Sequence, residues 1–291
     1  MSIMTKLEFQ MDFSDSEKKL SEYILNKGDK VLQMSARDLA NNTYTSPATI
    51  VRLCQKLGLK GYSDFKIKYS AELQADLNKS NRIDVNFPFN KNDRKEEIAH
   101  KIALLNREAI EDTLYLIDYD NLNKIVDLLY KSKDIDVYGL GNSMLAALDF
   151  EHKMMRIGRN IRVKTLPGEQ SFQAYNASKN HISIILSYSG ETLEIVNIAK
   201  LLKEKESKII LITSIGENEL IKYADYIINI GSREKIFRKI APFASKTSMQ
   251  YILDVIFSCI FQKDYDKNVE YKISMDNKYD QRHPHSPVND D

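Results

Sequence analysis

A short stretch of hydroxyl-bearing residues in this 291-residue chain follows directly after an apolar run rich in β-branched side chains. The run covers residues 182–186, and Ser187, Ser189, Gly190 and Thr192 come next. An apolar helical pattern then begins, so the stretch is predicted to be a turn between a buried strand and a helix. Free N–H groups and the positive end of the helix dipole attract anions at such a position. These residues therefore predict a binding site for a phosphate group.

A second predicted strand end carries a related pattern. Residues 135–138 are expected to form a strand, and Gly139, Gly141 and Ser143 follow it toward the start of a helix. Position 144 is methionine, so the third glycine of the dinucleotide-binding fingerprint is missing. Ligands of open parallel sheets bind at the carboxyl ends of strands, so we expect both turns to contribute to one site. The residues expected to bind the ligand are Gly141, Asn142, Ser143, Ser187, Ser189, Gly190, Glu191 and Thr192.

Strands and helices alternate over the C-terminal two-thirds of the chain. The predicted strands are residues 135–138, 161–165, 182–186, 209–213 and 226–230. Helical patterns precede, separate and follow them, from about residue 95 to about residue 261. Short apolar strands that alternate with helices favour a parallel sheet covered on both faces. The chain therefore belongs to the α/β class, with a doubly wound domain and a five-stranded parallel sheet preceded by an all-α N-terminal domain.

The N-terminal region has the pattern of a helix-turn-helix unit. Ser35 is expected to cap one short helix, and Ser46 with Pro47 to open a second helix after a three-residue turn. The second helix has one apolar face and one polar face. Between residues 46 and 70 five basic residues stand against one acidic residue, and this local excess suits the phosphates of DNA. The residues expected to contact DNA are Ser35, Thr45, Ser46, Ala48, Thr49, Arg52, Gln55, Lys56 and Lys60.

Composition and length bound the remaining possibilities. The formal net charge is +1, so any basic surface must be local. Cys54 and Cys259 lie in apolar helical patterns and are expected to be free thiols. No signal peptide, membrane span, metal-ligand spacing or cofactor-binding fingerprint is found, so a cytoplasmic protein without metal or cofactor is expected. We divide the chain into a helix-turn-helix domain (1–77), a polar linker (78–94), the α/β domain (95–265) and a C-terminal extension or tail (266–291).

Four segments resemble parts of two known families. The run from Ser187 to Thr192 resembles the phosphate loop of sugar isomerase (SIS) domains, and residues 139–143 resemble their first ligand loop. The run from Ser46 to Lys66 closely resembles the helix-turn-helix of the MurR/RpiR family of bacterial transcriptional regulators, and residues 244–257 match its C-terminal part. The resemblance implies a regulator of sugar or amino-sugar metabolism that binds operator DNA and responds to a phosphosugar. It also implies a homodimer or homotetramer on palindromic DNA.

An enzyme is the competing class. A phosphosugar isomerase with an accessory helical domain would need a base beside a carbonyl group. Glu169, Glu191, His152 and His181 are conceivable bases, but spacing singles out none of them. A plain isomerase has no use for a helix-turn-helix, which favours a regulator without catalytic activity.

Overall fold

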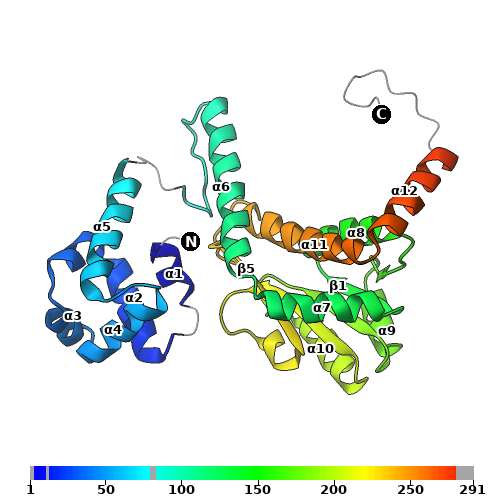
Figure 1. The fold of residues 1–291 in the computed structure, drawn as a ribbon, viewed down its shortest axis with the longest axis horizontal. Coiled ribbons are helices and arrows are strands. Elements are labelled where there is room, and N and C mark those ends of the chain that lie inside the picture. Colours follow the sequence, from blue (N-terminus) through cyan, green and yellow to red (C-terminus); the bar gives the residue numbers. More distant parts are fainter. Residues whose placement is uncertain (1–2, 11–12, 79–82, 280–291) are drawn as a thin grey trace.

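The computed structural model describes residues 3–10, 13–78 and 83–279, and these form two parts joined by the segment that contains residues 83–94 (Figure 1). The N-terminal part is entirely helical. It comprises α1 (Ile3–Phe9), α2 (Asp15–Lys27), the 3₁₀ helix η1 (Gly28–Gln33), α3 (Ala36–Asn42), α4 (Pro47–Lys56) and α5 (Tyr62–Asn78).

The helices of this part surround one apolar core. Leu7, Leu20, Leu39, Leu53 and Phe65 are among the residues buried in it, one from each of the five α-helices. The apolar face predicted for α4 points into this core, and its polar face points outward except at Thr49. Apolar residues at helical spacing therefore determine how the helices of the N-terminal part pack.

The second part begins with α6 (Lys95–Tyr115) and α7 (Tyr119–Lys131) and continues as alternating strands and helices. Its remaining elements are β1 (Ile135–Gly139), α8 (Asn142–Met155), β2 (Arg162–Val163), α9 (Glu169–Tyr175), β3 (Ile182–Leu186), α10 (Leu193–Glu204), β4 (Lys208–Ser214), η2 (Glu219–Tyr223), β5 (Tyr226–Ile230), α11 (Ala244–Lys263) and α12 (Tyr265–Tyr279). The strand order is β2-β1-β3-β4-β5 with every neighbouring pair parallel, which confirms the predicted sheet.

Alternate side chains of the strands build two separate cores. Ile184 and Ile210 point to the face covered by α7, α8 and α11. Ile185 and Leu211 point to the other face, which α9, α10 and η2 cover. Because both faces are buried, the central strands are apolar along nearly their whole length, and this is why the sequence revealed them.

Three elements differ from the prediction. Strand β2 has only two residues where residues 161–165 were expected, because it pairs only with β1 at the sheet edge. The helical pattern between the last two predicted strands, at residues 218–223, predicts a short helix, but the structure forms a 3₁₀ helix there. Helix α12 occupies much of the C-terminal extension, although no helix was expected there, and residues 280–291 of that extension lie outside the described residues. Over the described ranges, no helix is long and apolar enough to cross a membrane.

Candidate ligand cavity and nucleic-acid interface

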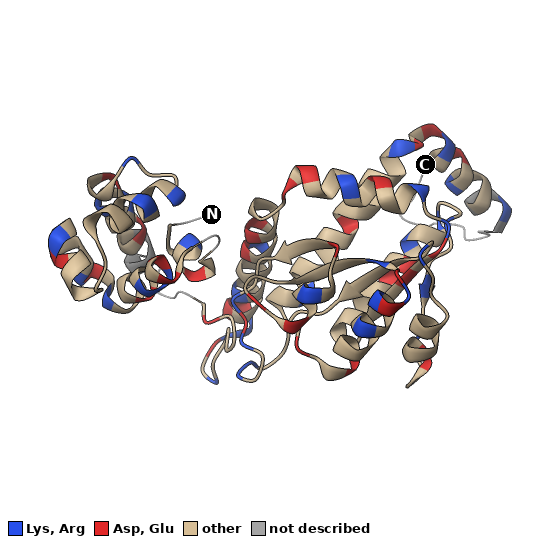
Figure 2. Cartoon of the chain, turned by 90° about the horizontal axis from the view of Figure 1, so that it is seen from below, with Lys and Arg blue, Asp and Glu red and all other residues tan. Residues whose placement is uncertain are grey.

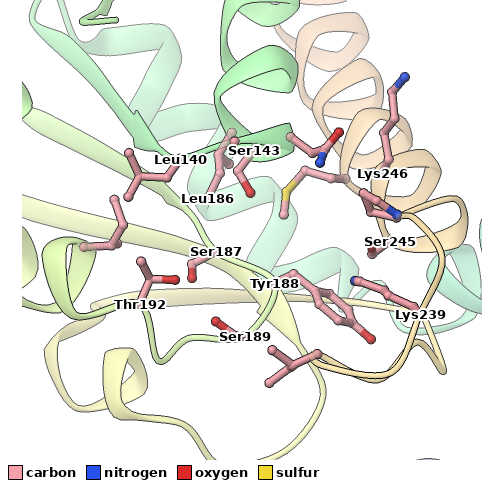
Figure 3. A pocket seen from close by; sticks show the side chains of 16 residues that line it. Leu140, Ser143, Leu186, Ser187, Tyr188, Ser189, Thr192, Lys239, Ser245 and Lys246 are labelled. Carbon is pink, nitrogen blue, oxygen red and sulfur yellow. The ribbon is translucent and has the colours of Figure 1, made fainter. Parts of the chain in front are cut away.

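A cavity of about 340 Å³ opens at the carboxyl edge of the parallel sheet (Figure 3). Its volume lies in the range of small-molecule sites, which is about 300–1,000 Å³. Six of the eight residues expected from the sequence line it: Gly141, Asn142, Ser143, Ser187, Ser189 and Thr192. The ends of β1 and β3 therefore meet at one site, as the sheet topology requires.

The turn after β3 is shaped by its own hydroxyl groups. The buried Ser187 hydroxyl accepts a hydrogen bond from the N–H of Gly190 at 3.2 Å, and Ser189 accepts one from the N–H of Glu191 at 3.2 Å. Gly190 has φ +65°, and a Cβ there would lie 2.0 Å from the side chain of Asn218. Only glycine fits this position without displacing a neighbour, and so the turn can stay tight.

Two helix N-termini open into the cavity. Thr192 is the N-cap residue of α10, and its side chain makes no capping hydrogen bond. Ser143 lies in the first turn of α8. The first N–H groups of an α-helix have no partner within the helix, and the helix dipole favours an anion beside them. These two helix starts can therefore donate hydrogen bonds to a phosphate group.

The other two expected ligand residues lie away from the cavity lining. Gly190 supports the turn as described above. The Glu191 carboxylate accepts a hydrogen bond from the N–H of Glu219 at 2.9 Å and so fixes the start of η2. Like charge also makes a carboxylate an unfavourable neighbour for phosphate.

The opposite wall of the cavity carries residues to which the sequence analysis assigned no role. Lys239 and Ser245 lie there beside Tyr188, and in Figure 3 the Lys239 side chain points toward Tyr188. The Lys239 ammonium is 4.9 Å from the Tyr188 ring centroid and 2.9 Å from a carboxylate oxygen of Glu234. Burial raises the pKa of Tyr188 to about 12, so its hydroxyl stays protonated and donates to the Glu234 carbonyl at 2.6 Å.

Glu234 satisfies a third helix N-terminus. Its side chain is 0% exposed, and it accepts hydrogen bonds from the N–H groups of Ala244 and Ser245, at 2.6 and 3.2 Å, and from the Ser245 hydroxyl at 2.5 Å. The start of α11 is thus already neutralised by the protein's own carboxylate. The open anion-binding positions are those of α8 and α10.

Little in the sequence could have revealed Lys239 or Glu234, because they lie in a loop without periodic pattern. Ser245 and Lys246 both line the cavity, and the sequence pattern could have pointed to them. They stand at the start of a long apolar helix, where hydroxyl and basic residues are candidates for ligand contacts.

The predicted helix-turn-helix is formed by α3 and α4. The Ser35 hydroxyl accepts a hydrogen bond from the N–H of Asp38 at 3.1 Å, and the Ser46 hydroxyl accepts one from the N–H of Thr49 at 3.2 Å. Both serines therefore act as the expected caps. Figure 2 shows basic residues on several outer helices of this domain, which lies at the left.

Most residues expected at the DNA are accessible. Seven are exposed, namely Ser35, Ser46, Ala48, Arg52, Gln55, Lys56 and Lys60, and Thr45 is half-buried. Thr49 was placed on the open face of the helix, but the structure buries it. The Thr49 hydroxyl lies 3.0 Å from the hydroxyl of the N-cap residue Ser46, and this contact holds the Thr49 side chain inward. The same hydroxyl accepts a hydrogen bond from Arg52 at 3.2 Å. Thr49 can therefore orient Arg52 rather than face a base itself.

Lys56 has a partner inside the domain. Its ammonium lies 2.7 Å from the carboxylate of Glu17 in α2, whose side chain is only 3% exposed. Burial raises the pKa of Glu17, but the hydrogen bonds from Lys56 and Ser14 lower it by more, so the carboxyl stays ionised. Lys56 thus compensates a buried charge in addition to any contact with DNA.

Tyr44 is a residue that the sequence analysis missed. It lies in the turn between α3 and α4, its side chain is 99% exposed, and its backbone has φ +53°. A non-glycine residue in this left-handed region is uncommon, and a fully exposed aromatic ring gains nothing from burial. The sequence signal that could have pointed to Tyr44 is an aromatic residue in the turn of a helix-turn-helix.

Comparison with known proteins identifies both parts of the chain. Residues 1–76 match the family model of the helix-turn-helix domain of the rpiR family, and residues 128–258 match that of the SIS domain. An HTH-type transcriptional regulator of Caldanaerobacter subterraneus is 32% identical over 264 residues, which cover 91% of this chain and 92% of that protein.

Two solved structures resemble this one. The Vibrio vulnificus NanR protein, complexed with ManNAc-6P, has a TM-score of 0.59 at 25% identity and covers 97% of this chain and 100% of its own. The sugar isomerase domain of an RpiR transcription factor from Sphaerobacter thermophilus has a TM-score of 0.55 at 14% identity and covers 62% of this chain and 98% of its own. The second likeness concerns the fold alone.

Replacing Lys56 by alanine is expected to destabilise the N-terminal domain by about 1–3 kcal/mol, because the buried Glu17 carboxylate loses a charged hydrogen-bond partner. The Glu17 pKa is lowered in the folded state. The stabilisation is therefore complete above the usual carboxyl pKa, and it is lost as the pH falls from that value through the lowered pKa of the folded state. Hydrogen exchange of α2 and α4 at pH 7 measures the effect. The control is Lys68→Ala, whose longer pair with Asp64 is more exposed. Equal exchange in both variants would contradict the assignment.

Proposed function

The chain belongs to the rpiR family of helix-turn-helix transcriptional regulators with a SIS domain, and we propose that a phosphorylated sugar bound in its cavity controls its affinity for operator DNA. One observation carries this proposal. A cavity with hydroxyl groups at two helix N-termini shares a chain with a helix-turn-helix whose second helix is open on its polar face.

The phosphate group is proposed to lie against Ser143, Ser187, Ser189 and Thr192. Hydroxyl and N–H donors hold a phosphate without placing a fixed charge beside it. Lys239 supplies an ammonium group on the opposite wall. The ManNAc-6P of the NanR complex supports an amino-sugar phosphate as the class of effector.

We propose that the cavity senses its ligand and does not convert it. An isomerase needs a base within reach of the sugar. None of the four bases considered from the sequence lines the cavity: Glu191 holds η2, His152 lies on α8, and Glu169 and His181 line a different pocket. These placements favour a receptor over an enzyme.

DNA recognition is assigned to the start of α4 and the turn before it. Arg52 is proposed to contact a phosphate or a base edge, and Gln55 and Ala48 lie on the same exposed side. Tyr44 is proposed to stack or pack against the DNA backbone beside them. Helices α6 and α8 expose Ile110, Leu114, Leu145 and Met155, which supports burial in a homodimer. Two-fold symmetry would place two α4 helices on palindromic half-sites about 34–36 Å apart, or a multiple of this.

Tyr44→Gly is expected to weaken DNA binding while leaving the fold intact, because glycine accepts the left-handed backbone and removes only the ring. Arg52→Ala is expected to lower the slope of log affinity against log salt by about one if Arg52 contacts phosphate. Fluorescence anisotropy measures both, with a duplex selected by the protein from a random library. The exposed Phe172 in α9 provides the control, Phe172→Ala. Wild-type affinity and slope in the Tyr44 and Arg52 variants would contradict the assigned face.

The effector assignment is tested with sugars that differ only in phosphorylation. ManNAc-6P, other amino-hexose 6-phosphates and unphosphorylated N-acetylmannosamine are titrated into the protein–DNA complex. We expect a phosphorylated sugar to change DNA affinity and the unphosphorylated sugar to have no effect. Loss of one hydrogen bond to a charged group corresponds to about 10–100-fold in affinity, so Thr192→Val should weaken the response by that order. Ser274→Ala on α12 is the control. A response to no phosphosugar would refute the proposed function.

A further inference from the structure

The loop between β5 and α11, residues 231–243, is shared by the ligand cavity and the contact between the two domains. Ile236, Lys239 and Pro242 from this loop line the cavity. The Lys239 ammonium can respond to an anion in the cavity, because it faces the cavity while it pairs with Glu234. A phosphate bound opposite would attract it away from that carboxylate.

The residue before Glu234 faces the other domain. Arg233 lies 3.6 Å from the Glu8 carboxylate of α1 and 3.1 Å from the Glu108 carboxylate of α6. Glu234 at the same time holds the start of α11 and Lys239. One loop therefore reaches the cavity through Lys239, the partner of Glu234, and the DNA-binding domain through Arg233.

Helix α1 continues this connection toward the DNA-binding helix. It lies on the side of the N-terminal domain that faces the second domain (Figure 1). The Lys6 ammonium donates a hydrogen bond to the carbonyl of Leu57, directly after α4, at 3.0 Å. The same ammonium lies 5.1 Å from the ring centroid of Tyr115 in α6. A shift of α1 would therefore act on the end of α4.

The segment that joins the domains is bound to the same loop. The Asn86 side chain accepts a hydrogen bond from the N–H of Lys235 at 2.7 Å, and its carbonyl accepts one from the N–H of Ile240 at 2.9 Å. The first residue of the loop, Gly231, is anchored to α6. Gly231 donates to the Thr113 hydroxyl at 3.0 Å, and a Cβ on Gly231 would lie 2.6 Å from Asp112. The loop is thus fixed to α6 at its start and bonded to the domain connection farther on.

We propose that Lys239 is the ligand-sensing residue of this regulator and that the Arg233–Glu8 ion pair passes its response to α1 and thereby to α4. This inference rests on the proposed function. A ligand changes DNA affinity only if it binds one arrangement of the chain better than another. The Arg233–Glu8 pair is long, and Arg233 also pairs with Glu108, so Arg233 keeps a carboxylate partner in an arrangement where its contact with Glu8 is lost.

A double-mutant cycle tests this connection without any ligand. Lys239→Gln removes the charge that an effector would draw away, and Glu8→Gln removes the contact with Arg233. DNA affinity of the full chain is measured on a duplex selected from a random library. We expect Lys239→Gln alone to change the dissociation constant about threefold or more. We expect most of this change to vanish in the Glu8→Gln background, because residues that act through one connection are not additive.

Two further variants keep the result interpretable. Lys239→Arg retains the charge and is expected to keep wild-type affinity, which attributes the effect of Lys239→Gln to the lost charge, and an unchanged thermal unfolding transition of Lys239→Gln excludes loss of folding as the cause. Lys222→Gln breaks an exposed ion pair with Glu219 and is expected to change nothing. Additive effects of the two substitutions, or wild-type affinity in Lys239→Gln, would overturn the inference. Because no effector is used, this outcome is independent of whether a phosphosugar is the natural ligand.

Discussion

The arrangement depends on how the helix N-termini at the carboxyl edge of the sheet are neutralised. Three helices, α8, α10 and α11, begin around the same cavity, and each presents N–H groups and a partial positive charge. The chain supplies a buried carboxylate, Glu234, to α11 alone. The starts of α8 and α10 carry hydroxyl groups instead, and an external anion can complete them. The proposed preference for a phosphorylated ligand rests on this difference between the three helix starts.

The position of Glu234 also explains why the cavity is connected to the rest of the chain. A carboxylate buried at a helix start must keep its hydrogen bonds to the N–H groups of that helix, so the loop that carries it stays attached to α11. That loop bears Arg233 on the side of the DNA-binding domain and Lys239 on the side of the cavity. The helix-turn-helix has its own core and its own caps, so it can move as a body while its recognition surface stays intact.

Sequence patterns predicted the architecture far better than the walls of the site. The strands were recognisable because both faces of the sheet are buried, and the caps at Ser35 and Ser46 because hydroxyl residues precede apolar helical patterns. The turn after β3 was recognisable for the same reason. Lys239 and Glu234 come from a loop whose conformation depends on contacts with Asn86 and Tyr188, far away in sequence. The burial of Thr49 and the exposure of Tyr44 depend on local turn geometry that periodicity does not describe.

Linkage between the two sites gives the most direct test of a DNA-binding regulator controlled by a phosphosugar. If the sugar changes DNA affinity by a given factor, DNA must change sugar affinity by the same factor. The measurement is the dissociation constant of the most effective phosphosugar, by calorimetry, with the full chain free and saturated with its selected duplex. We expect two different constants, whose ratio equals the ratio of the DNA affinities with and without the sugar. Equal constants would show that the cavity and the helix-turn-helix act independently, which would contradict the account.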